Sequence, residues 1–140
     1  MRSGLIDLGK ALDELADTDV VGLPNEDVRT ALPALLSAFN QISALVATVV
    51  ASFDTRDLSQ ADACKTTTAW LVAFGRMTGG TAAALLTRGR LLRELPALHA
   101  AATHGHASTE HVNRVVELTE PLRVLWRLGY PRLVSSVGVL

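Results

Sequence analysis

Apolar residues recur at alternating steps of four and three through the first half of the chain, and this spacing predicts one long helix. The positions are Val28, Leu32, Leu35, Phe39, Ile42, Val46, Val49 and Phe53. They form an a/d seam of more than three heptads, which Leu36, Leu45 and Val50 widen on either side. We therefore expect a helix that lies buried along a helical bundle.

The same stretch carries no charged residue from Thr30 to Phe53, so a membrane span has to be weighed. Asn40 and Gln41 would then lie near the bilayer centre, which favours the buried bundle helix and no membrane. Asn25 would cap the helix, and Pro33 would either kink it or delay its true start.

A shorter amphipathic helix is expected before it, between Met1 and Asp19. Its apolar stripe is spaced at helical intervals and consists of Leu5, Leu8, Leu12 and Leu15. A break from Asp19 to Pro24 would separate the two helices.

Residues 66–95 predict two helices joined by a tight turn, a hairpin like the helix–turn–helix. Thr67 or Thr68 would cap the first helix, and Gly75 would end it in the left-handed conformation. Its buried face would hold Trp70, Leu71 and Phe74.

Thr78 would cap the second helix of this hairpin. Its apolar residues share one face and are Ala82, Leu85, Leu86, Leu92 and Leu95. Gly89 lies in the middle of this helix, where glycine costs about 1 kcal/mol against alanine unless a neighbouring backbone needs the space.

Two further helices are expected after the hairpin. Pro96 would open a short one that ends at Gly105, and Ser108 or Thr109 would cap a longer one that Pro121 interrupts. The prediction is an all-α bundle of five or six helices. Residues 1–120 would form the helical domain and residues 121–140 a divergent C-terminal tail.

The composition of the 140 residues agrees with helices packed on helices. Apolar residues make up 49% of the chain but aromatic residues only 4%, so the core must consist of Ala, Leu and Val. The lone Cys64 can form neither an internal disulfide nor a paired-cysteine zinc site, which favours the cytoplasm.

The net charge of −1 hides an uneven distribution. Residues 1–65 hold five basic and ten acidic side chains, whereas residues 66–140 hold eight arginines and four glutamates. Arginines around the hairpin could contact DNA phosphates weakly and without sequence preference, and they are Arg76, Arg88, Arg90 and Arg93. Solvated arginines on helix surfaces are the alternative.

Four histidines fall close together, at His99, His104, His106 and His111. Imidazole is a common metal ligand, but Glu110 is the only carboxylate nearby, so capping and hydrogen bonding are the expected roles. The sequence contains no Gly-x-Ser-x-Gly element and no phosphate-binding glycine loop. We therefore expect no catalytic, cofactor-binding or metal-binding residue.

Several short pieces of sequence after residue 63 together resemble the pattern of a known family. They are Thr68-Ala69-Trp70-Leu71, Gly80-Thr81-Ala82, Arg90-Leu91-Leu92, Leu95-Pro96, Ala100-Ala101, His104-Gly105 and Ser108-Thr109-Glu110-His111-Val112. In this order and spacing they resemble the 13E12 repeat family of actinobacterial proteins, whose N-terminal part is catalogued as domain of unknown function 222. The likeness covers about residues 25–120.

Members of that family usually continue into a C-terminal HNH nuclease module, which needs His and Asn residues around a divalent metal. No such constellation follows Glu120. The resemblance implies a non-catalytic, nuclease-associated helical domain, a truncated or frame-shifted copy of a longer gene, that serves as an accessory DNA-contacting module. The alternatives are a protein-interaction or oligomerisation bundle, with the long helix at a homo-oligomer interface, and an inactive remnant.

Overall fold

The computed structural model describes residues 1–129, which are all-α and contain no β-strand. The α-helices are α1 (Arg2–Ala16), α2 (Asn25–Thr55), α3 (Thr67–Ala73), α4 (Gly79–Glu94), α5 (Pro96–Thr103) and α6 (Thr109–Arg127). Two short 3-10 helices are η1 (Val20–Gly22) and η2 (Leu58–Asp62). The predicted all-α fold with one long helix is confirmed.

The chain divides into two compact units, the first of which covers Met1–Leu36. It holds α1, η1 and the beginning of α2, and α1 has no buried residue. Asp19 caps η1 by accepting hydrogen bonds from the backbone N–H groups of Val21 and Gly22. The predicted break between the two helices therefore lies where the sequence placed it.

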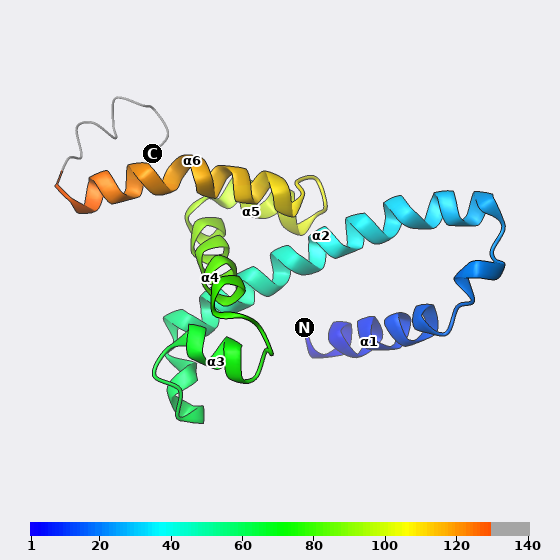
Figure 1. Ribbon diagram of the computed structural model, residues 1–140, viewed down its shortest axis with the longest axis horizontal. Coiled ribbons are helices and arrows are strands. Elements are labelled where there is room, and N and C mark those ends of the chain that lie inside the picture. Colours follow the sequence, from blue (N-terminus) through cyan, green and yellow to red (C-terminus); the bar gives the residue numbers. More distant parts are fainter. Residues whose placement is uncertain (130–140) are drawn as a thin grey trace. The chain divides into compact units, whose positions relative to one another are not determined.

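The second unit begins at Ser37, and α4 contributes the largest share of its core. Figure 1 shows α3 at the amino end of α4, and α5 and α6 near its other end. The buried core consists of Ala44, Ala47, Val50, Leu71, Ala82, Leu85, Leu86, Leu91, Leu92, Ala102, Ala107 and Val112. As predicted, these residues are all Ala, Leu or Val.

The face of α2 that enters the core is not the predicted a/d seam. The buried residues of α2 are small, apart from one valine: Ala44, Ala47, Val50 and Ala51. The seam residues on the other side are between 39% and 63% exposed: Val28, Leu32, Leu35, Phe39, Val46 and Val49. Ile42 and Phe53 of the seam are half-buried. The prediction of a seam buried along its length is wrong, because α4 packs against the side of α2 where small residues let two backbones approach closely.

The close approach of α2 and α4 depends on Gly89. A Cβ atom at this position would overlap the backbone carbonyl oxygen of Ala47 and would lie 3.1 Å from the Cβ of Ala51. Glycine therefore stands in the middle of α4 because the neighbouring backbone needs the space.

Neither proline ends a helix. α2 begins at Asn25 and passes through Pro33, and α6 passes through Pro121 to Arg127. Of the two alternatives predicted for Pro33, a kink or a late start, the late start is wrong, and so is the predicted interruption at Pro121. Both prolines are exposed, so water can bind the carbonyl that each one leaves without its helical partner.

The predicted C-terminal tail is partly helical. Residues 121–127 belong to α6, and residues 130–140 of the predicted tail lie outside the described residues.

The hairpin forms with small shifts from the prediction. Thr66, one residue before the predicted cap, accepts a hydrogen bond of 3.1 Å from the backbone N–H of Ala69. Thr78 caps α4 as predicted, through the N–H of Thr81. Arg76 and not Gly75 has the left-handed backbone, with a φ of 54°. Gly75 is required for another reason, because a Cβ there would lie 2.6 Å from the carbonyl oxygen of Leu71.

The aromatic residues of α3 are less buried than predicted. Leu71 is buried, Trp70 is half-buried and Phe74 is exposed, because a seven-residue helix turns only one narrow face to the core. The Trp70 ring lies between those of Phe53 and Phe74, with ring centroids 4.7 and 5.2 Å away. Its indole N–H donates a 2.7 Å hydrogen bond to Asp62, so the polar edge of the ring faces η2.

Candidate functional site

The four arginines that were candidates for DNA contact do not form one surface. Arg76 is exposed in the turn between α3 and α4. Arg90 and Arg93 contact the C-terminal end of α2, whereas Arg88 is half-buried between α2 and α6. Arg90 and Arg93, which are three positions apart, therefore share one face of α4, and Arg88 lies on another.

Arg90 and Arg93 hold the end of α2 against α4. Arg90 forms an ion pair of 2.9 Å with Asp54, and Arg93 donates a hydrogen bond to the Thr55 hydroxyl. Burial by itself would raise the pKa of Asp54. Hydrogen bonds from Arg90 and Thr67, and the charges of Arg90 and Arg93, outweigh burial and hold that pKa below its usual value. Both arginines thus already serve the packing of α4 on α2.

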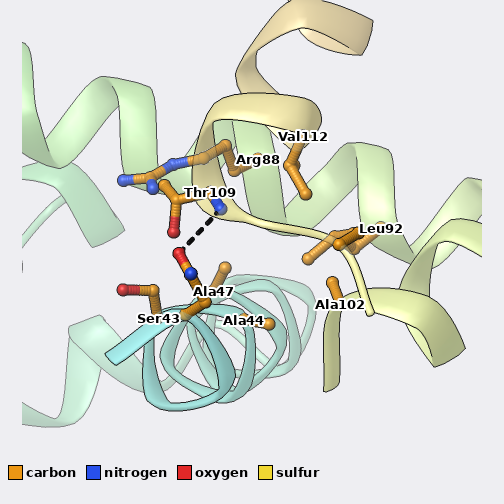
Figure 2. Close-up of a pocket in the computed structure, with 10 residues that line it drawn as sticks. Ser43, Ala44, Ala47, Arg88, Leu92, Ala102, Thr109 and Val112 are labelled. Carbon is orange, nitrogen blue, oxygen red and sulfur yellow. Dashed lines mark hydrogen bonds between the residues drawn. The ribbon is translucent and has the colours of Figure 1, made fainter. Parts of the chain in front are cut away.

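Arg88 lines a small, mostly apolar cavity between α2, α4, α5 and α6 (Figure 2). The Asn40 side chain accepts a 3.0 Å hydrogen bond from the backbone N–H of Thr109, which anchors the start of α6 to α2. Burial lowers the pKa of Arg88, and the charge of Glu110 opposes that shift. The cavity measures about 10 Å³, room for about one water molecule, so it is too small for an organic ligand.

These positions bear directly on DNA contact. A phosphate that recruited Arg90 would compete with Asp54, and Arg88 would have to leave its half-buried place. Arg93 donates to Thr55 and keeps further N–H groups. Only Arg76 extends from an exposed turn without such a contact among the described residues. DNA contact through the four arginines stays a prediction, and it would rest on few phosphates.

Two of the four histidines cap or extend helix ends. The ring N–H of His104 lies 2.8 Å from the carbonyl oxygen of Ala100. His111 Nδ1 accepts a hydrogen bond from the backbone N–H of Ser108, whose hydroxyl in turn accepts one from the N–H of His111. The expected capping role is confirmed for these two residues.

Within residues 1–129, no group of three His, Cys, Asp or Glu residues is placed to hold a metal ion.

The apolar side of α2 that was predicted to lie in the core is exposed, and we call it the outer face of α2. In the first unit it comprises Val28, Leu32, Leu35 and Leu36, and in the second Phe39, Leu45, Val46 and Val49. The heptad spacing was the correct signal for an apolar face. The prediction that this face lies in the core was wrong because heptad spacing does not say whether the same chain or a partner covers the apolar face.

By length and composition α2 could also cross a membrane, and 22% of its most apolar window is buried in the protein. Long core helices of soluble proteins and signal sequences meet the same criterion, so this finding alone assigns no membrane location.

Comparison with known proteins yields no relative: no model of a known family, no curated protein and no solved structure matches the chain. The resemblance to the 13E12 repeat family therefore stays a prediction. The described side chains and surfaces are the basis on which a function can be proposed.

Proposed function

We propose that this protein is a non-catalytic helical module that pairs with a second copy of itself through the outer face of α2. The observation that carries the proposal is a set of eight large apolar residues, each at least 39% exposed, on one helix. Apolar surface of this extent is favoured to leave water, and a partner surface is the usual way to cover it.

A second copy is the occupant that the pattern favours. Six of the eight residues keep the a/d spacing that lets two like helices interlock side chains along a shared seam. The run from Thr30 to Phe53 has no charge, so two such helices do not repel each other. With 31 residues, α2 is about 46 Å long, which is enough for a seam of several heptads.

The predicted family context is compatible with this proposal. As the helical part of an HNH-associated, cytoplasmic protein of the 13E12 repeat family, the module would bring two chains together. Weak DNA contact through the exposed Arg76 would be secondary, because Arg90 already pairs with Asp54 and Arg88 is half-buried. The module itself would hydrolyse nothing.

Sedimentation velocity over a hundredfold range of concentration tests the pairing. We expect the wild type to change from monomer to dimer as concentration rises. The double substitution Phe39→Lys and Val46→Lys should leave a monomer at every concentration, because two lysines on the seam would repel their counterparts. Both positions are exposed, so circular dichroism should show an unchanged helix content.

Leu118→Lys is the matched control, since Leu118 is an exposed leucine on α6 and not on α2. That variant should pair like the wild type. A wild type that stays monomeric throughout, or a double variant that still dimerises, would contradict the proposal. Recovery of the wild type only in a membrane fraction that detergent must dissolve would instead favour the membrane span.

A further inference from the structure

A cleft in the second unit lies between the C-terminal half of α2, the end of α4 and the start of α5. Its volume is about 580 Å³, within the range of clefts that hold small organic ligands. The residues that line it are Thr48, Ala51, Ser52, Thr55, Arg56, Gly89, Leu92, Arg93, Pro96 and His99. Segments of three helices thus line one cleft, and they contribute both polar and apolar side chains.

The lining of the cleft is basic and contains no carboxylate. Arg56 and Arg93 supply two full positive charges, and His99 adds an imidazole. The nearest acids on the same helices form ion pairs elsewhere: Asp54 pairs with Arg90, although the charge of Arg93 also acts on it, and Glu94 pairs with Arg123. The cleft therefore favours an anion.

Hydrogen-bond donors remain available inside this basic lining. Among the described residues, the side chains of Ser52, Arg56 and His99 form no hydrogen bond. Arg93 donates only to Thr55, and a guanidinium carries five N–H groups. The Thr55 hydroxyl donates to the Ala51 carbonyl, so the free donors are arginine, serine and histidine groups. Arginine, serine and histidine donors are groups that bind phosphate oxygens in proteins.

The other side of the cleft is apolar, with Ala51, Leu92 and Pro96. The C-terminal end of α2 brings a partial negative charge of about one half, which the two arginines outweigh. A ligand that fits both sides has a doubly charged anionic group and a compact organic body.

We propose that this cleft binds a small phosphate monoester, with its phosphate between Arg56 and Arg93 and its organic body against Leu92 and Pro96. Ser52 and His99 donate to the remaining phosphate oxygens. The site does not depend on pairing through α2. None of its lining residues belongs to the outer face.

Isothermal titration calorimetry with AMP, inorganic phosphate and adenosine tests the site. AMP should bind, phosphate should bind more weakly and compete with AMP, and adenosine should bind at least about tenfold more weakly than AMP. The double substitution Arg56→Ala and Arg93→Ala should weaken AMP binding about tenfold or more. Arg56→Ala alone keeps the contact between Arg93 and Thr55, and it should give a smaller loss with the fold intact.

Arg114→Ala is the control for net charge, because Arg114 is an exposed arginine of α6 outside the cleft. It should change the affinity for AMP less than about twofold. No binding of AMP, equal binding of adenosine, or an unchanged affinity in the double variant would each overturn the proposal. Duplex DNA that binds at this cleft and is not displaced by AMP would overturn it as well, and would assign the arginines to nucleic acid.

Discussion

At the scale of single residues, the packing of the second unit depends on the absence of a side chain. Gly89 lets α4 approach α2 so closely that a methyl group would overlap the Ala47 carbonyl oxygen. The helix propensity of glycine argues against this position by about 1 kcal/mol, and the tertiary contact outweighs that cost. Gly75 has a similar role beside the Leu71 carbonyl in the turn of the hairpin.

Gly89→Ala should lower the free energy of unfolding by about 1–3 kcal/mol, because the added methyl group meets backbone that cannot rotate away. Urea denaturation measures this change. Gly80→Ala is the matched control in the same helix, where a Cβ would meet nothing within 4 Å. It should be neutral or stabilising by up to about 1 kcal/mol, and equal losses in both variants would show that the close approach is not what matters.

At the scale of elements, α6 shows how tertiary contact carries a helix past a proline. Pro121 removes one backbone hydrogen bond, yet the helix continues to Arg127. Beyond the proline, Arg123 pairs with Glu94 at the end of α4, and its side chain is only 14% exposed. This contact ties the last turns of α6 to the C-terminal end of α4.

Arg123→Gln should therefore destabilise the protein by about 1–2 kcal/mol, between the values typical of exposed and of buried ion pairs. Arg114→Gln provides the comparison, because Arg114 pairs with Glu117 on the open surface of the same helix. That change should cost less than about 0.5 kcal/mol. If Arg123→Gln cost no more than the control, the end of α6 would contribute nothing to the fold.

At the scale of the whole molecule, the helices of each unit leave large apolar residues of that same unit exposed. Two stripes remain uncovered, one on α1 and one on the outer face of α2. Stability should then depend on protein concentration, since association favours the folded state by mass action.

We expect the thermal midpoint of the wild type to rise by about 3–6 °C for a tenfold rise in concentration. The variant with Phe39→Lys and Val46→Lys should keep a constant midpoint. Differential scanning calorimetry at several concentrations measures both. A constant midpoint in the wild type would mean that the outer face does not pair in the folded protein.

Local patterns determined the helices of this protein. Heptad spacing predicted α2, and the side-chain caps at Thr78 and Ser108 predicted where α4 and α6 begin. The shortage of aromatic residues predicted a core of Ala, Leu and Val. Each of these features depends on residues within a few positions of one another, so a single sequence contains the information.

Which face of each helix is buried, and which charges meet, depends on how the helices pack together. The small residues of α2 form its inner face because Gly89 of α4 can approach there, whereas the larger seam residues stay outside. Arg56, Arg93 and His99 line one cleft from three segments of the chain. The physical reason is that shape and charge complementarity between distant segments arises only when helices pack, and no local spacing encodes it.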